Sequence, residues 1–268
     1  PWAYPLVRVR SGLSFQVKDM TGQDICVVPN QFFLGQRAIY VLVWKAVRGL
    51  VENTMEDEKE IDATISTCMD FIQTRVPGAR FVLAVTHTDC VQSWELQRQM
   101  KRVRELVHRK LKSFCVDNSD ENFILPLEVD CDGESFPVNC LNGKGVYALR
   151  SRLKLLAEQS PWWRESIPTN FVEFQQAISK KAIDEGLTWI SWQHYEDLGR
   201  KMGLQANLLK ICTKFLNDLA SIKYFGTYED LPRIDLIDCT VFINPNWMIN
   251  AFRGLICHDR ESLFTYFG

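Results

Sequence analysis

Residues 17–24 have the sequence VKDMTGQD and stand where a predicted β-strand passes into a loop. Ahead of them, residues 13–18 alternate apolar and polar side chains, which is the period-two pattern of a strand with one buried face. Asp19 therefore falls at the carboxyl end of the strand, where α/β folds place their ligand-binding residues. The stretch predicts an α/β fold with a polar site at this edge of the sheet.

The side chains of this stretch suit a phosphate-bearing ligand and a metal ion. The carboxylate of Asp19 can hold the hydration shell of Mg²⁺. Gly22 has no Cβ, so its backbone N–H can approach a terminal phosphate, and Gln23 can orient an attacking water. The pattern Asp-x-x-Gly also ends many strands as an ordinary turn, so both interpretations stay open at this point.

Length and composition indicate a globular protein. A chain of 268 residues predicts two medium domains, and a net charge of -2 gives no bulk electrostatic reason to bind nucleic acid or an anionic membrane. The longest apolar run, residues 38–44, is far shorter than the ~20 residues that cross a bilayer. The nine cysteines form no C-x-x-C pair and no secretory signal opens the sequence. We therefore expect a cytoplasmic protein without structural zinc.

Strands and helices alternate along the first half of the chain. Tight-turn residues Ser11 and Gly12 predict a hairpin over residues 5–18. Continuous apolar runs predict strands at 37–44 and 80–85, each buried on both faces, and a further strand is expected at 122–129. Helical periodicity appears at 56–76, 94–114 and 145–157. This alternation predicts a mainly parallel sheet with flanking crossover helices.

The second half has a different pattern. Residues 158–168, EQSPWWRESIP, contain two prolines and predict a linker. Helices expected at 170–183, 191–201 and 208–220 are followed by strands at 222–225 and 240–243. This order predicts a mostly helical, winged-helix-like unit, a type of fold usually associated with DNA. The helix that would enter a groove has few cations besides Lys210 and Lys214, which favours protein interaction.

Two further polar motifs follow predicted strands, THTD at 86–89 and DCD at 130–132. With the motif at 19–23, they stand in the order that a GTPase needs. In the guanine-recognition role, Asp89 would accept two hydrogen bonds from the N1–H and exocyclic amine of the base, a pair that adenine does not offer. Thr86 would hold the loop together.

These motifs resemble a known family. D-x-x-G-Q at 19–23 resembles the second switch of small GTPases, and T-H-x-D at 86–89 resembles the Roc GTPase domain of Roco proteins, as does FFLGQRAIYVLVW at 32–44. KFLNDLASIKYF at 214–225 and FINPNWMINAF at 242–252 resemble the start of COR, the domain that follows Roc. The resemblance covers nearly the whole chain.

The resemblance implies a small-GTPase-like Roc part at 1–157, a linker at 158–168 and the N-terminal part of COR at 169–268. It implies GTP or GDP as nucleotide, with Mg²⁺ held by Asp19 through water and Gln23 as the catalytic residue. The implied nucleotide-binding residues are Asp19, Gly22, Thr86, His87, Asp89, Asp130 and Cys131.

The sequence also departs from the family. It contains no G-x-x-x-x-G-K-[ST] motif, so the Roc part is expected to be truncated at its start, without the phosphate-cradling loop and the first switch. Thr21 replaces a small Ala, and Asp130 with Cys131 replaces the usual Ser-Ala beneath the guanine. We expect this chain alone to be inactive as a GTPase, although the resemblance implies that its parent protein binds and hydrolyses GTP.

Two functions from different classes remain open. The first is a Roc-COR regulatory module of a Roco-type GTPase, a hydrolase that signals through COR, has protein partners there and can form a homodimer in the full-length parent. The second is a non-enzymatic interaction scaffold with a GTPase-like fold that binds no nucleotide. A winged-helix nucleic-acid binder is the least favoured. A P-loop upstream of Pro1 would separate the first two.

Overall fold

A computed structural model describes residues 6–8, 14–19, 34–47, 54–116, 135–226, 239–244, 247–248 and 251. The chain forms two compact units, one of Ala38–Trp163 and the other of Pro1–Arg37 together with Arg164–Gly268. The contacts thus group the first 37 residues with the C-terminal part of the chain. The division into 1–157, 158–168 and 169–268 stays a prediction.

A parallel three-stranded sheet forms the centre of the unit Ala38–Trp163, with the strand order β3-β4-β5. β3 (Ile39–Lys45) pairs with β4 (Arg80–Thr86) along its full length, and β4 pairs with the short β5 (Phe136–Pro137). The carboxyl ends of all three strands therefore lie at one edge of the sheet. This parallel sheet confirms the α/β class expected from the sequence.

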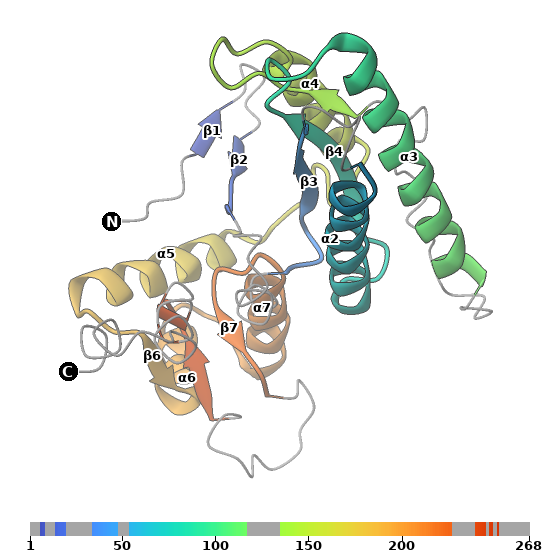
Figure 1. The fold of residues 1–268 in the computed structure, drawn as a ribbon. Helices are drawn as coiled ribbons and strands as arrows, with labels where there is room; N and C mark the ends of the chain where they lie inside the picture. The colour runs from blue at the N-terminus through green and yellow to red at the C-terminus, as the bar shows by residue number, and fades with distance from the viewer. Residues whose placement is uncertain are drawn as a thin grey trace, which may run out of the picture. The chain divides into compact units, whose positions relative to one another are not determined.

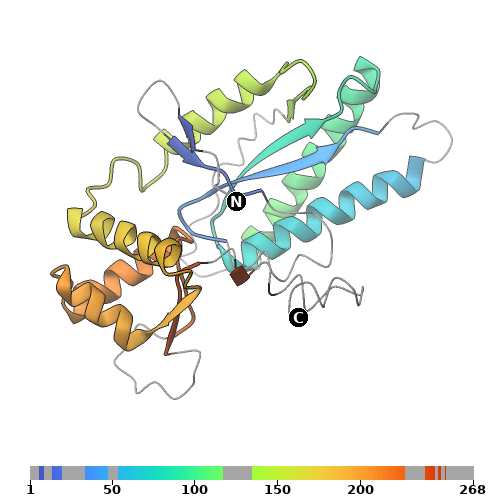
Figure 2. The same cartoon turned by 90° about the vertical axis from the view of Figure 1, so that its left-hand side faces the viewer.

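Helices cover both faces of this sheet, as Figure 2 shows. α4 (Val146–Glu158) lies on one face, while α2 (Thr54–Arg75) and α3 (Ser93–Val116) lie on the other. Val76 separates the end of α2 from Pro77 and Gly78, which cannot continue a helix, because proline lacks an N–H and Gly78 has a positive φ of 78°. None of the helices in the described part of the chain is long and apolar enough to cross a membrane.

The two central strands differ in burial. Residues 81–85 of β4 are all buried, which confirms the prediction of a strand covered on both faces. The same prediction for β3 is wrong, because Val43 is 61% exposed while Leu42 and Trp44 on its other face are buried. Among the described strands, β3 pairs only with β4 and is therefore an edge strand of this sheet.

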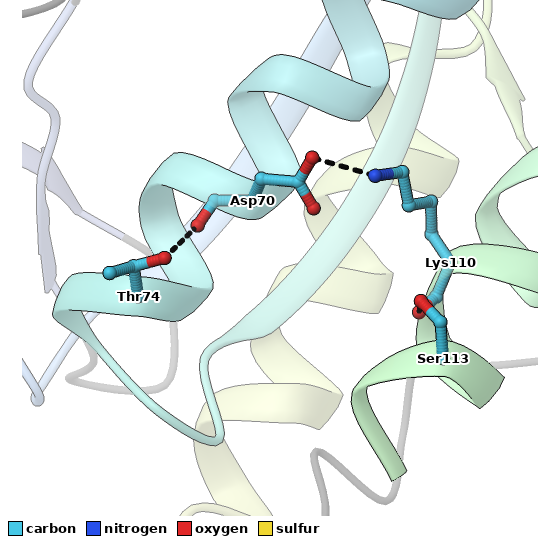
Figure 3. A network of polar contacts seen from close by, with 4 residues as sticks. All are labelled: Asp70, Thr74, Lys110 and Ser113. Atoms are coloured by element: carbon cyan, nitrogen blue, oxygen red, sulfur yellow. Dashed lines mark hydrogen bonds and ion pairs between the residues drawn. The ribbon is translucent and has the colours of Figure 1, made fainter. Parts of the chain in front are cut away.

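Two ion pairs connect α2 with α3, which lie side by side (Figure 1). Asp62 accepts from Arg102 at 2.7 Å, and Asp70 accepts from Lys110 at 2.6 Å. Figure 3 shows the second pair together with Thr74 and Ser113, whose hydroxyls donate to backbone carbonyls of their own helices. All four charged groups are partly exposed, so each pair contributes at most about 1 kcal/mol and serves mainly to set the helices' register.

In residues 169–226 and 239–244 of the second unit, the structure describes helices followed by an antiparallel sheet. The elements are, in order, α5 (Thr169–Asp184), β6 (Trp189–Ser191), α6 (Trp192–Lys201), α7 (Ala206–Asp218), β7 (Lys223–Tyr224) and β8 (Thr240–Phe242). The strand order is β6-β8-β7, with both pairs antiparallel. This is the winged-helix-like arrangement expected from the sequence, with β6 as an added strand that the sequence pattern did not indicate.

The core of the winged-helix-like unit is aromatic. Phe174 and Tyr195 pack edge to face with ring centroids 5.0 Å apart, and both are fully buried. The buried Thr213 hydroxyl lies 3.1 Å from the Tyr195 hydroxyl and donates to the Leu209 carbonyl at 2.7 Å, so the core's polar atoms have partners there. Ser191 caps α6 by accepting from the His194 backbone N–H at 3.3 Å, as predicted.

The hairpin expected near the start of the chain is present. β1 (Leu6–Arg8) pairs antiparallel with β2 (Ser14–Gln16), with Leu6 opposite Gln16. Residues 17–19 follow β2 without regular structure.

Arg80 is the first residue of β4, and its side chain hydrogen-bonds to the C-terminal end of α4. Its guanidinium donates to the carbonyls of Leu156 and Gln159, at 3.0 and 3.1 Å, and to the Ser160 hydroxyl at 3.3 Å. The last carbonyls of a helix have no partner within it, and a cation there also interacts favourably with the helix dipole. Arg80 therefore fixes α4 against the sheet.

We expect Arg80→Ala to lower the free energy of unfolding by about 1–3 kcal/mol, because charge-assisted hydrogen bonds are lost. Thermal unfolding followed by circular dichroism measures this. Arg109→Ala, at an exposed arginine of α3, is the matched control and should change stability little. Equal stability of the two variants would contradict the capping role.

Candidate functional site

Thr86 ends β4 and connects it to the neighbouring strand. Its hydroxyl donates to the Trp44 carbonyl at 3.3 Å, and its own carbonyl accepts from the Ala46 backbone N–H at 3.0 Å. Beyond them, the buried side chain of Gln99 on α3 makes two hydrogen bonds to the backbone of Val47, at 3.2 and 2.8 Å. The ends of β3 and β4 and the helix α3 are thus held together at this edge of the sheet.

The chain turns sharply after Thr86. His87 has a φ of 57°, in the left-handed region that residues with a Cβ seldom adopt. The turn is closed by a hydrogen bond of 3.0 Å from the Cys90 backbone N–H to the His87 carbonyl, and the His87 Nδ1 lies 3.2 Å from the Thr86 hydroxyl. Such backbone conformations cluster at binding sites.

Asp89 lies within this turn and is exposed. The Cys90 thiol donates weakly to its Oδ2, with a sulfur–oxygen distance of 3.7 Å. A thiol is a weak donor, so the carboxylate keeps its capacity to accept stronger hydrogen bonds from a ligand. The position and the chemistry of Asp89 both suit a ligand-binding carboxylate at a strand's carboxyl end.

A second loop begins at the same sheet edge, after β5, and was missed by the sequence interpretation. Val138 continues the pairing, since its N–H donates to the Val85 carbonyl at 2.8 Å. The buried Asn139 then organises the loop, because its Oδ1 accepts from the backbone N–H groups of Leu141 and Asn142 at 2.8 and 3.4 Å. Asn139 was the one sequence signal for this loop, since asparagine favours turns. The strand β5 gave no signal, because a two-residue strand containing proline shows no periodicity.

This loop ends at the N-cap of α4. Gly145 has a φ of 85°, and a Cβ on it would lie 1.8 Å from the Pro137 carbonyl oxygen. Residues 142–145 thus form the entrance to α4. The close approach holds the loop against the end of β5.

The predicted site residues are distributed as follows. Thr86, His87 and Asp89 lie together in the unit Ala38–Trp163, and the loop after β5 begins beside them. Asp19 is exposed and belongs to the other unit. Gly22, Gln23, Asp130 and Cys131 lie outside the described residues, as does the strand expected at 122–129. Their roles stay predictions.

Comparison with known proteins gives the family context. No family model matches the chain. It is 22% identical over 256 residues to the probable serine/threonine-protein kinase pats1 of Dictyostelium discoideum, covering 94% of this chain and 7% of that protein. It is also 22% identical over 256 residues to the probable serine/threonine-protein kinase roco6 of the same organism, covering 92% of this chain and 10% of that protein.

A solved structure agrees with this context. The RocCORdC fragment of Methanosarcina barkeri Roco2, bound to GDP, matches with a TM-score of 0.58 and 18% identity, over 88% of this chain and 59% of that one. The chain is related to the Roco family. Its fold is similar to that of the Roco2 RocCORdC fragment. The chain spans a tenth or less of the two Dictyostelium relatives.

The loop after β5 can be tested by stability. We expect Gly145→Ala to destabilise the unit Ala38–Trp163 more than Gly143→Ala does. Both residues have positive φ, at 85° and 74°, but a Cβ at Gly143 meets no atom within 4 Å. Gly143→Ala should therefore cost only the left-handed penalty of about 1–2 kcal/mol, and Gly145→Ala clearly more. Denaturant unfolding measures both, and equal losses would contradict the close packing of Gly145 on Pro137.

Proposed function

We propose that this chain is the Roc-COR module of a Roco-type GTPase, whose parent protein binds guanine nucleotide with Mg²⁺, hydrolyses GTP and signals through COR. The observation that carries the proposal is the exposed carboxylate of Asp89 at the carboxyl end of β4, in a turn held by Thr86 and His87. Asp89 then accepts the N1–H and the exocyclic amine of guanine, a charge-assisted pair that gives base specificity. The GDP bound to Roco2 supports this choice of ligand.

The loops flanking Asp89 complete the base site. The sequence assigns the backbone N–H groups near the guanine oxygen to Asp130 and Cys131. The loop of residues 138–140 is a second candidate for this role, because it leaves the sheet directly beside β4 and is kept in shape by Asn139. Thr86 positions the turn and does not need to touch the base.

Asp19 and Gln23 serve the phosphate end of the nucleotide. Mg²⁺ in such sites is bound by one or two carboxylates together with waters and the substrate phosphates, so a single exposed carboxylate such as Asp19 fits this ion. Mg²⁺, when bound, neutralises charge on the phosphates. Gly22 offers a backbone N–H to the terminal phosphate, and Gln23 orients the attacking water.

A protein-interaction role through the COR part is favoured by a separate observation. Trp189, Phe242 and Lys223 lie opposite one another across the sheet β6-β8-β7, and Trp247 stacks on Phe242 with ring centroids 6.3 Å apart. Both tryptophans are more than 40% exposed. Aromatic side chains with one cation are typical of protein interfaces. The alternative function, a scaffold without nucleotide, rests on this surface alone.

The base-reading role of Asp89 predicts a change of specificity in the full-length protein. Asp89→Asn should lower GTP affinity at least about tenfold, because charge-assisted hydrogen bonds of roughly 1.5–3 kcal/mol are lost, and should favour xanthosine triphosphate in relative terms. Competition with a fluorescent GDP analogue measures both affinities. Asp184→Asn, at an exposed position of α5, is the control. Unchanged preference in a folded Asp89→Asn variant would show that 86–89 is not the guanine site.

The proposed role of Gln23 predicts a change in the hydrolysis rate and not in nucleotide affinity. Gln23→Leu in the full-length protein should leave GTP affinity unchanged and slow hydrolysis by on the order of tenfold or more, because the attacking water loses its orienting group. Single-turnover phosphate release measures the rate. A normal rate in this variant would remove Gln23 from the catalytic step while leaving nucleotide binding intact.

A further inference from the structure

The helix α3 has a buried face and an exposed face. Val103, Val107 and Leu111 on the inner face are buried within the unit Ala38–Trp163. Figure 1 shows α3 at the margin of this unit. Its outer face carries exposed side chains at spacings of three and four residues, which are Trp94, Arg98, Lys101, Glu105, Arg109 and Lys112. We call these six residues the basic stripe.

The basic stripe is positive although the chain as a whole is not. It contains four basic side chains and one acidic side chain, Glu105, whereas the whole chain has a net charge of -2. The overall charge therefore gives no attraction to an anionic partner, but the outer face of α3 does.

The cations of α3 differ in whether acidic side chains neutralise them. On the side of α3 toward α2, Arg102 and Lys110 are paired with carboxylates of α2. Within the part of the chain that the structure describes, Lys101, Arg109 and Lys112 on the basic stripe form no ion pair. Their charge is thus available to a partner outside the molecule.

The shape of the basic stripe suits a flat surface. An α-helix rises 1.5 Å per residue, so the cations from Arg98 to Lys112 extend along a straight line of roughly 20 Å. The long stems of lysine and arginine let their charged ends reach a common plane while the helix itself stays outside it. A planar array of negative charges, such as a bilayer surface, can contact all of them at once.

Trp94 stands at one end of the basic stripe and is 54% exposed. Its Nε1 donates to the Gln92 Oε1 at 2.9 Å, so the ring can move out of water without leaving a hydrogen-bond donor unpaired. Tryptophan is enriched at membrane–water interfaces, where its ring lies at the level of the headgroups. Trp94 thus adds an interfacial anchor to the line of cations.

We propose that the basic stripe of α3 is a docking surface for an anionic phospholipid bilayer, on which the helix lies parallel to the membrane plane. This role is separate from nucleotide binding. Lysines are depleted from specific protein interfaces, whose centres are apolar, and this argues against an acidic protein as the partner. Single-stranded nucleic acid stacks on several successive aromatic rings, whereas the stripe has only Trp94.

Sedimentation of the full-length protein with vesicles tests this proposal. Binding is expected to vesicles of phosphatidylcholine with phosphatidylserine and not to vesicles of phosphatidylcholine alone. Each basic residue near an anionic surface strengthens binding roughly fivefold, so Lys101→Gln combined with Lys112→Gln should weaken it about 25-fold. Arg109→Gln alone should weaken it about fivefold. An ionic strength of about 1 M, with a Debye length of about 3 Å, should abolish binding.

The matched control is Lys180→Gln combined with Lys201→Gln, which changes the net charge equally at exposed lysines of α5 and α6. It should bind phosphatidylserine vesicles like the unmodified protein. Thermal unfolding followed by circular dichroism checks that each variant is folded, and Arg109→Gln tests the stripe independently of the double variant.

Several results would overturn the proposal. One is the absence of binding to phosphatidylserine vesicles, and another is unchanged binding by the folded stripe variants. An equal loss in the control would show an effect of net charge and not of the stripe. Tighter binding to duplex DNA or to polyglutamate than to the vesicles would assign the basic stripe to a nucleic acid or to an acidic protein instead.

Discussion

The parallel pairing of β4 with its two neighbours is the constraint on which the unit Ala38–Trp163 depends. β4 is buried on both faces, so its residues are apolar from Phe81 to Val85 and no polar chemistry fits within it. Chemistry becomes possible where the strand leaves the core, and Thr86 is the first residue there. Because parallel strands end at the same edge, the loop after β5 begins beside the turn that contains Asp89.

Backbone hydrogen bonding explains the residues around this edge better than side-chain packing does. Strand ends leave N–H and C=O groups without partners in the ladder, and here several of them are paired with nearby polar groups. Thr86 and Ala46 connect two strands, Gln99 serves Val47, and Asn139 serves the loop after β5. These polar groups shape the edge of the sheet, and Asp89 adds an exposed carboxylate among the described residues of this edge.

Much of this arrangement could be predicted from the sequence, because helices and strands each give their apolar residues a characteristic spacing. The helices α2 to α7 and the strand β4 were found in this way, and the motif at 86–89 followed from its place after a strand. The strands β5 and β6 were missed: β5 has two residues, one of them a proline, and β6 has three residues and leads directly into α6. Exposure of Val43 was missed because an apolar run does not tell which strands lie beside it.

Contacts between distant parts of the chain leave no such local signal. Lys18 follows the alternation of its strand and would be assigned to solvent by any pattern of neighbouring residues, yet it lies on the end of a helix two hundred residues later. Gly35 is similar. Its neighbours in the sequence do not indicate why a glycine is needed, whereas the structure does, because a Cβ there would collide with the Asp218 carbonyl. The sequence shows which helix or strand each segment can form. The partner of a segment depends instead on which helix end lacks hydrogen-bond donors and on which backbone can approach closely enough to contact it.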